Sequence, residues 1–499
     1  MGTGTPCPHG TSRGCLVSDL WEHQKEGVAF AMRSIEAVGG AALFWEMGTG
    51  KTRGALEVML RLGAERVLVV CPKVVVPVWD REAVKYLGAG APPVLALDMD
   101  GTKVKAAALA GFDAGIVVVN YDSVWREPLA SALRAWAPGL MVLDELHRIK
   151  SPTGRASKWL GALAVKVPAR LGLTGTPLAH GPLDVWAEYR AVAPSIFAPT
   201  FGAFRSRYTR PALRSEWRDT DVMVTAGRGG ELSRWKMDDV AHLEAEVYRC
   251  AHRVRVVDVL DLPESSDVVV EASLEKEASR IYDEIQADFI ADVSSSSSPS
   301  SSSSSSSSPV VVTAANAMVV ALRLAQVTGG TLRDDAGGSH VVSVAKRDAL
   351  AEYLEGMAGE PVVIFGRFRT DLDAIHQAAA AAGLSSSELS GRRSELAAWQ
   401  RGDTCVLVAQ VAAGSVGIDL TRARVAVWYS LSYNLAEYVQ SRARVLRPGQ
   451  TRAVVFAHVI AKGTIDESVY RALEARGDVV AAIVDGVVAT SRRLPTIRA

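Results

Sequence analysis

A glycine-rich turn between an apolar run and a helix-like segment carries the residue types best suited to phosphate chemistry. Residues 41–52 read A-A-L-F-W-E-M-G-T-G-K-T. The glycines allow backbone conformations that a Cβ would forbid, so successive N–H groups can point at an anion on the helix N-terminus. Lys51 would reach the β- and γ-phosphates of a nucleotide, and the Thr52 hydroxyl would ligate Mg²⁺. The residues expected to contact the nucleotide are Gly48, Thr49, Gly50, Lys51 and Thr52.

Two acidic residues follow a second apolar run in M-V-L-D-E-L-H, downstream of Lys51. Asp144 would hold Mg²⁺ through water, and Glu145 would orient and deprotonate the attacking water. The two carboxylates therefore suit the acidic half of an ATPase site.

A third group of candidate residues lies in the run Q-S-R-A-R-V-L-R-P-G-Q, which begins at Gln440. Arg444 and Arg447 lie three residues apart, and this spacing predicts that both lie on one face of a helix and point across a cleft. A guanidinium at the γ-phosphate neutralises the charge that develops during phosphoryl transfer. We therefore expect Arg444 and Arg447 to act as arginine fingers, with Gln440 as a coupling residue.

Three further polar residues fit the same chemistry. Gln24 precedes the glycine turn, and its amide both donates and accepts, so it can read the edge of an adenine. Thr174 and Thr176 lie in L-T-G-T-P, where their hydroxyls can bond to the acidic motif and to a second lobe. We expect these two threonines to couple the parts of the site.

Each of these motifs has a simpler interpretation when taken alone. The glycine turn lacks the first glycine of the usual loop, because Trp45 stands there, and such a turn can arise by chance. Paired acidic residues are common in solvated turns, T-G-T-P alone is merely a turn, and an arginine-rich helix is often solvated. Their joint occurrence favours a nucleotide site.

The elements that position these residues alternate between strand-like and helix-like segments. An amphipathic helix is expected over 27–35, before the glycine turn. Such alternation predicts a parallel sheet covered by helices, with ligands at the carboxyl ends of the strands. The pattern restarts near Ala325, which predicts a second lobe. The expected strands are 66–71, 116–120, 140–144 and 170–174 in the first lobe and 362–365, 405–408, 424–429 and 454–459 in the second.

Composition limits the class of protein. The 499 residues suffice for two or three domains, and 55 basic and 55 acidic residues balance, so any face that binds nucleic acid must be local. Arginine supplies 42 of the basic residues, which suits phosphate binding but also fits a coding bias. Five scattered cysteines indicate a reducing compartment, and no apolar segment is long enough to span a membrane. We therefore expect a cytoplasmic protein.

The segment between the two expected lobes gives weaker signals. Basic and aromatic residues interleave over 201–218, so Arg205 and Arg207 either grip a phosphate backbone or lie on a solvated helix face. The serine tract 294–308 has nothing to bury, which predicts a disordered loop between two helices. A second, weaker basic patch is expected from Arg249, Arg253 and Arg255.

Along the chain, Gln24 is followed by the glycine turn, then by the acidic pair and then by L-T-G-T-P. Motifs in this order resemble the first lobe of superfamily-two helicases, and specifically the Swi/Snf-type DNA translocases with their compact phage and bacterial members. Trp79 and Glu82 match the block that follows the second strand in that family, and 148–151 matches the tail of the acidic motif. Two residues depart from the family pattern. Leu146 replaces a small residue, and His180 stands where the family often has Asn.

The second half carries two further motifs of that family. P-V-V-I-F-G-R-F resembles the fourth motif, which implies that Arg367 and Arg369 face nucleic acid. A-A-G-S-V-G-I-D-L resembles the fifth, which implies that Gly417 permits a tight backbone and that Asp419 orients an arginine or the ribose. The family commonly has His and Ile where this chain has Leu446 and Pro448.

The resemblance implies two RecA-like α/β lobes with parallel sheets and helical protrusions between them, with ATP and Mg²⁺ as cofactors. It implies a DNA-dependent ATPase, expected to be a monomer without membrane contact, that moves along double-stranded DNA. The alternatives are a strand-separating helicase on forked DNA or RNA, and an ATP-switched DNA-binding subunit of a larger complex. The expected parts are a disordered leader 1–15, a first lobe 16–195, an insertion 196–325, a second lobe 326–485 and a tail 486–499.

Overall fold

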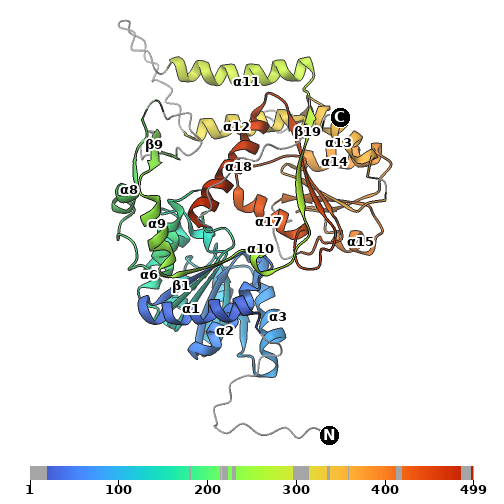
Figure 1. Cartoon of the computed structure of the whole chain (residues 1–499). Helices are drawn as coiled ribbons and strands as arrows, with labels where there is room; N and C mark the ends of the chain where they lie inside the picture. The colour runs from blue at the N-terminus through green and yellow to red at the C-terminus, as the bar shows by residue number, and fades with distance from the viewer. Residues whose placement is uncertain are drawn as a thin grey trace, which may run out of the picture. The chain divides into compact units, whose positions relative to one another are not determined.

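Two compact units make up the computed structural model of the chain, and each is described by itself (Figure 1). The first holds the described residues up to Leu178 together with Leu183–Arg205 and His242–Val259, and the second holds most of the remainder. The residues described are 20–178, 181–213, 215, 223–226, 232–295, 314–333, 338–357, 359–411, 418–484 and 496–497.

A parallel sheet of seven strands forms the centre of the first unit, in the order β10-β1-β6-β5-β2-β4-β3. Its central strands are runs of Val, Leu and Ile that are buried along almost their whole length, as expected where helices cover both faces of a parallel sheet. The strands are β1 (Gly40–Trp45), β2 (Arg66–Cys71), β3 (Val94–Ala96), β4 (Gly115–Asn120), β5 (Leu140–Asp144), β6 (Ala169–Leu173) and β10 (Ala251–Val254).

Helices connect these strands. Buried side chains of the first three pack with β1 and β2 in one apolar core. The α-helices are α1 (Glu22–Val38), α2 (Lys51–Leu62), α3 (Val76–Leu87), α4 (Thr102–Ala110), α5 (Leu129–Trp136), α6 (Arg155–Ala164), α7 (Asp184–Val192), α8 (Phe201–Tyr208), α9 (Val240–Tyr248) and α10 (Val256–Val259). Short 3₁₀ helices are η1 (Lys73–Val75), η2 (Gly88–Gly90) and η3 (Leu146–Ile149).

The second unit has its own parallel sheet of seven strands, in the order β15-β16-β14-β17-β18-β11-β19. Side chains of one face pack with α15, α17 and α18, and those of the other face pack with α13 and α14. The strands are β11 (Ser265–Ala272), β14 (Val362–Gly366), β15 (Ser386–Leu389), β16 (Val406–Gln410), β17 (Val425–Trp428), β18 (Val454–Ala461) and β19 (Thr496–Ile497).

Helices and two small antiparallel sheets complete this unit. The helices are α11 (Lys276–Ser295), α12 (Ala314–Thr328), α13 (Ala345–Glu355), α14 (Arg369–Ala381), α15 (Leu396–Arg401), α17 (Leu435–Val445) and α18 (Ile465–Val484). The small sheets are β7 (Thr209–Pro211) with β9 (Leu232–Met237) and β8 (Met223–Ala226), and β12 (Thr331–Arg333) with β13 (Ser339–Val341).

The segment 196–325, predicted as an insertion between the lobes, contributes to both main sheets. β10 pairs with β1 in the first sheet, and β11 pairs with β18 in the second. β10 contains His252 and Arg253, and β11 begins with Ser265, Ser266 and Asp267, so neither strand has the unbroken apolar run that marks the others. The helices α11 and α12 that flank the serine tract pack on each other, while residues 296–313 lie outside the described residues.

The strands predicted from the sequence are present; β2 and β5 have the predicted ends, and the ends of the others differ by at most two residues. The helix expected over 27–35 is longer, because α1 begins at Glu22 and ends at Val38, where Gly39 with its φ of 75° caps it. Among the helices in the described ranges, none combines the length and the apolar character that a membrane crossing requires.

Candidate active site

The predicted phosphate-binding loop joins the end of β1 to the start of α2. Gly48 and Gly50 adopt left-handed backbone angles, with φ of 88° and 81°, and Gly50 directly precedes Lys51, the first residue of α2. A Cβ at Gly50 would lie 2.2 Å from Gln24 Nε2, so the position requires glycine. The first turn of the helix then presents backbone N–H groups that suit anionic oxygens.

Lys51 and Thr49 bond to the backbone at the beginning of this loop. Lys51 Nζ donates to the carbonyl oxygens of Trp45 and Glu46, at 2.9 and 3.4 Å. The Thr49 hydroxyl donates to the Glu46 carbonyl at 2.7 Å. Thr49 is buried, and Thr52 is half-buried in the first turn of α2. The Lys51 ammonium is therefore held inside the loop that the sequence assigns to phosphates.

Gln24 lies on α1 and bonds to this loop. Its Nε2 donates to the Thr49 carbonyl at 3.1 Å, and its Oε1 accepts from the Trp21 backbone N–H at 3.0 Å. His23 Nε2 lies 2.9 Å from the same Thr49 oxygen. Both ends of the Gln24 amide are thus bonded within the chain, and reading an adenine edge would require these bonds to exchange.

The first acidic residue, Asp144, ends β5 beside the loop. Its Oδ2 accepts a hydrogen bond from Trp79 Nε1 at 3.1 Å, and its backbone oxygen accepts one from the Tyr121 hydroxyl at 2.9 Å. Burial raises the pKa of Asp144 to about 7 and the charge of Glu145 adds to this shift, whereas the charge of Lys51 opposes it. Sequence reasoning missed Tyr121 as a partner and gave Trp79 no contact.

Glu145 has a left-handed backbone, with φ of 55°, which is rare for a residue with a side chain and is a mark of many functional sites. His147 Nδ1 lies 3.5 Å from Glu145 Oε2, 3.1 Å from the Thr174 hydroxyl and 3.4 Å from the Thr176 hydroxyl. Burial lowers the pKa of His147 to about 4, although the Glu145 charge opposes this shift. The neutral His147 ring therefore links the two threonines to the acidic motif, a role that the sequence did not indicate.

The arginine helix of the second unit is shorter than predicted. α17 ends at Val445, and Leu446 has an extended backbone with ψ of 91°. The prediction that Arg444 and Arg447 share one helical face is therefore wrong, because Arg447 lies beyond the helix. Pro448 explains this difference, since a proline disfavours helical angles at the residue before it.

Both arginines nevertheless contact one segment of the chain. Arg447 Nη1 donates to the Ile418 carbonyl at 3.3 Å, and the Leu420 backbone N–H donates to the Arg444 carbonyl at 3.1 Å. This segment is the end of the predicted fifth motif, whose Gly417 lies outside the described residues. The turn after α17 is thereby fixed against residues 418–420.

Asp419 is exposed at the same place. Burial tends to raise its pKa, but hydrogen bonds from Thr421 and the charge of Arg447 outweigh this effect, so the pKa lies below its usual value. The expected pairing of Asp419 with an arginine thus has electrostatic support. Gln440, the predicted coupling residue, is buried on α17.

A chain of hydrogen bonds holds α17 to the sheet. Arg442 Nη2 donates to Asp267 Oδ2 at 3.1 Å, and Arg442 Nη1 donates to the Tyr438 hydroxyl at 2.8 Å. The Tyr438 hydroxyl lies 2.9 Å from His458 Nε2, and His458 Nδ1 lies 3.3 Å from the Val268 carbonyl. A carbonyl can only accept, so Nδ1 carries the proton and Nε2 accepts from Tyr438. We call these groups the α17 clamp, which the sequence did not reveal.

Comparison with known families identifies the chain. A family model described as "SNF2-related domain" matches residues 23–326, more than half of the sequence. The chain belongs to the SNF2-related family. A second model, "Helicase conserved C-terminal domain", matches residues 345–449.

Individual relatives agree with this assignment. Protein p41 of Acyrthosiphon pisum secondary endosymbiont phage 1 is 25% identical over 85% of this chain and 89% of its own length. The chromodomain-helicase-DNA-binding protein 1-like of Danio rerio is 23% identical, and the DNA repair and recombination protein RAD54B of Gallus gallus is 24% identical, over 90% and 94% of this chain. The chain spans only 42% and 55% of these two vertebrate proteins.

A solved structure described as the Sulfolobus solfataricus SWI2/SNF2 ATPase core in complex with dsDNA is 21% identical, covers 96% of this chain and 95% of its own, and has a TM-score of 0.43. The predicted resemblance to Swi/Snf-type superfamily-two ATPases and the fold of two parallel-sheet lobes are confirmed. The SNF2-related chain is thus an enzyme, a DNA-dependent ATPase.

Two arginines predicted to face nucleic acid follow the end of β14. The Arg367 backbone N–H donates to Asp371 Oδ2 at 3.1 Å and to the Ser430 hydroxyl at 2.8 Å. The Arg367 side chain is half-buried, and burial lowers its pKa even though the Asp371 charge opposes this. Arg369 is exposed in the first turn of α14. Both arginines thus lie just after β14, where the hydrogen bonds of the Arg367 backbone N–H fix the turn into α14.

The other two predicted contacts lie on α8, two residues apart. Residues at this spacing do not share a helix face. Arg205 is half-buried, whereas Arg207 is exposed and forms an ion pair with Asp239 at 3.0 Å. The structure therefore does not gather Arg205 and Arg207 into one basic surface.

The weaker basic patch is not present as predicted, because its three arginines all have acidic partners. Arg249 pairs with Glu246 at 2.8 Å, and Arg255 pairs with Asp258 at 2.7 Å. Arg253 reaches Glu46 in the phosphate-binding loop at 2.7 Å, and its side chain is only 14% exposed.

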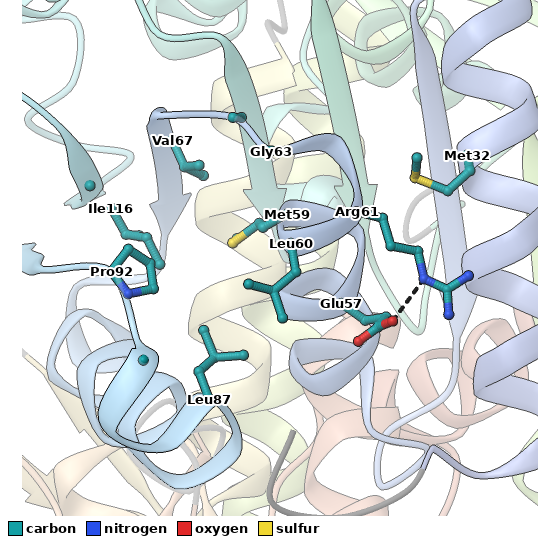
Figure 2. Close-up of a pocket in the computed structure, with 13 residues that line it drawn as sticks. Met32, Glu57, Met59, Leu60, Arg61, Gly63, Val67, Leu87, Pro92 and Ile116 are labelled. Atoms are coloured by element: carbon teal, nitrogen blue, oxygen red, sulfur yellow. Dashed lines mark hydrogen bonds and ion pairs between the residues drawn. The ribbon is translucent and has the colours of Figure 1, made fainter. Parts of the chain in front are cut away.

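A cavity of about 810 Å³ lies in the first unit, away from this loop. Figure 2 shows Leu60, Leu87 and Ile116 on its walls and the ion pair of Glu57 and Arg61 on one side. Its strand residues belong to the amino ends of β2 and β4, whereas the loop and the acidic motif lie at carboxyl ends. The cavity is therefore no part of the candidate active site.

Proposed function

We propose that the SNF2-related chain couples ATP hydrolysis to movement along duplex DNA. The observation that supports this most is the arrangement at the carboxyl edge of the first sheet. There the loop of Lys51 and the buried Asp144 lie close enough for the lysine charge to act on the carboxylate. A cation and a tuned carboxylate at one sheet edge suit a nucleoside triphosphate.

Each residue of the first unit has a distinct proposed role. Lys51 leaves the carbonyls of its own loop and contacts the β- and γ-phosphates. Glu145 accepts a proton from the attacking water, and the neutral His147 beside it relays changes at the acidic motif to Thr174 and Thr176. The contacts of His147 with Glu145, Thr174 and Thr176 support the role given to His147.

The oxygen donors at this edge fit Mg²⁺. The Thr52 hydroxyl and the Asp144 carboxylate are hard ligands of the kind that this cation prefers, and phosphates would supply the rest. Groups of three His, Cys, Asp or Glu side chains that could hold a metal by themselves do not occur among the described residues. When bound, Mg²⁺ would neutralise charge on the phosphates.

The second unit is proposed to supply Arg444 and Arg447 to the γ-phosphate. ATP bound by both units favours their closure, and hydrolysis removes the phosphate that holds them together. Repeated closure becomes stepping if both units grip one DNA duplex. Arg205, Arg207, Arg367 and Arg369 remain the proposed contacts to its phosphates, and relatives named as DNA-binding and DNA-repair proteins support a DNA substrate. A monomeric state and a cytoplasmic location stay predictions.

Two substitutions test this function. We expect Lys51→Ala and Glu145→Gln each to lower the DNA-stimulated kcat for ATP by at least about a hundredfold, because each removes a group that acts on the transferred phosphate or the water. ATPase rates should be measured with duplex DNA, single-stranded DNA, forked DNA and RNA in parallel.

The matched controls are Lys158→Ala and Glu36→Gln, which change exposed residues of the same types. They should leave the rate unchanged. Full stimulation by duplex DNA in Lys51→Ala or Glu145→Gln would rule out the proposed site. Displacement of a third strand from blunt duplex is the expected movement, and unwinding of forks without triplex displacement would instead identify a strand-separating helicase.

A further inference from the structure

Arg253 joins three parts of the first unit with one guanidinium group. Its Nη2 donates to Glu46 Oε1 at 2.7 Å. Its Nη1 donates to the carbonyl oxygens of Phe44 and Gly175, at 3.1 and 3.4 Å. Phe44 lies at the end of β1, Glu46 lies in the phosphate-binding loop, and Gly175 lies between the two coupling threonines. Arg253 itself is on β10, so it ties the loop and the T-G-T-P turn to that strand.

Glu46 completes this connection with its second carboxylate oxygen. Glu46 Oε2 accepts from the Val256 backbone N–H at 2.8 Å. The Glu46 backbone carbonyl is one of the two that accept from Lys51 Nζ. The same residue therefore contacts the lysine on its backbone side and the chain after β10 on its side-chain side.

The chain after β10 leads from one unit to the other. β10 is the last strand of the first sheet in chain order, and β11 is the first strand of the second. Residues 255–264 connect these two strands, and we call them the crossover. Glu46 bonds to the crossover near its start, at the Val256 backbone N–H. The crossover leads into β11, where Asp267 bonds to Arg442 of the arginine helix α17. The crossover is thus tied at one end to the phosphate-binding loop and at the other to α17.

We propose that the ion pair of Glu46 and Arg253 is a positioning pair that couples the state of the phosphate-binding loop to the crossover. This inference rests on the proposed function, since it concerns how ATP in the loop affects the second unit. For Lys51 to reach the γ-phosphate, its bonds to Trp45 and Glu46 must exchange. A shift of the Glu46 backbone moves its carboxylate, and with it the Val256 N–H.

The chemistry of the pair suits transmission of a small movement. A charged hydrogen bond is shorter and stronger than a neutral one and holds its geometry. The Arg253 side chain is 14% exposed and that of Glu46 32%, so water screens the pair less than it screens a surface pair. In addition, the two partners lie 207 residues apart in the sequence, so the pair joins parts of the chain that contacts between neighbouring residues cannot join.

The first experiment replaces each partner and measures ATPase kinetics with and without duplex DNA. For Arg253→Met and Glu46→Gln we expect kcat with DNA to fall by about tenfold, while KM for ATP changes less than about threefold. Arg253→Lys keeps the positive charge but loses the forked N–H donors of the guanidinium, and should retain more DNA stimulation of the ATPase than Arg253→Met. Loss of stimulation with KM preserved distinguishes a positioning role from a merely structural one.

The double variant Glu46→Gln with Arg253→Met gives the second measurement. Its loss of stimulation should be close to that of either single variant, because both remove one shared interaction. Arg249→Ala, which removes an exposed arginine paired with Glu246 near the same strand, is the matched control and should keep full stimulation. Thermal unfolding of each variant verifies that the fold is intact.

The outcomes separate this inference from the proposed function. If the unmodified chain shows no DNA-stimulated hydrolysis, the proposed function fails. If stimulation is present and both Arg253→Met and Arg253→Lys keep it in full, or if the losses multiply in the double variant, the coupling role is wrong. If KM rises as much as kcat falls, the pair belongs to ATP binding and the inference is also wrong.

Discussion

At the scale of single residues, the partners of a functional group explain more than its identity does. Asp144 is an acidic residue at a strand end, as many are, but a buried Trp79 donates to one of its oxygens and Tyr121 fixes its backbone. The hydrogen bond from Trp79 favours the charged form and the orientation of Asp144, against burial that raises its pKa. Trp79 therefore supports the proposed Mg²⁺ ligand.

Removal of the Trp79 hydrogen bond should weaken the binding of Mg²⁺. Trp79→Phe removes the donor but keeps most of the volume, so the Mg²⁺ concentration for half-maximal ATPase should rise by about tenfold. Trp159→Phe is the matched control, since Trp159 is also buried but its Nε1 has no hydrogen-bond partner among the described residues. Equal Mg²⁺ dependence in the two variants would contradict the role given to Trp79.

At the scale of elements, α17 depends on its clamp. Burial lowers the pKa of His458 to about 4, with the nearby Asp267 charge opposing this and the Arg442 charge adding to it. In the unfolded chain a histidine titrates at about 6.5. Between these values the unfolded state binds more protons than the folded state, so the free energy of unfolding must decrease as the pH falls from about 6.5 to about 4.

Replacement of His458 should therefore reduce the loss of stability at low pH. His458→Gln keeps an acceptor for Tyr438 and a donor for the Val268 carbonyl without a titrating ring. Urea unfolding at pH 7.5 and pH 5 should show a smaller loss of stability for His458→Gln than for the unmodified chain. His340→Gln, at an exposed position of β13, should lose as much as the unmodified chain. An identical loss in all three would show that His458 titrates normally.

The elements that sequence reasoning located are those with a local signal. Gly48 and Gly50 mark the loop because the backbone requires glycine there, and apolar runs mark the buried strands. The end of α17 was misjudged because a three-residue spacing fits a helix equally well when Pro448 stops it. β10 and β11 were missed because their assignment depends on which sheet they join.

The features of the site that the sequence did not reveal are contacts between residues far apart in the chain. His147 with Thr174, Trp79 with Asp144 and Glu46 with Arg253 join residues that the sequence places 27, 65 and 207 positions apart. The T-G-T-P motif led us to expect a bond from the threonines to the acidic motif, but no periodicity or motif indicates the individual partners, since they follow from the strand order of the sheet. The types of the site residues could therefore be predicted, and their partners could not.

At the scale of the whole molecule, two parallel sheets are joined by a crossover that is held at both ends. The first unit carries the phosphate-binding loop and the acidic motif, and the second carries α17 with Arg444. The family assignment covers both parts through its two matched models. The proposed function requires that arginines from the second unit complete a site begun in the first.

The kcat of Arg444→Ala and Arg447→Ala on duplex DNA, measured beside the affinity for a fluorescent ATP analogue, tests this claim most directly. We expect each kcat to fall by about a thousandfold while the affinity changes less than tenfold, because the guanidinium acts on the charge that develops in the transition state. Arg401→Ala, an exposed arginine of the same unit that pairs with Asp403, should hydrolyse ATP normally. Undiminished kcat in both Arg444→Ala and Arg447→Ala would show that neither arginine acts on the transferred phosphate.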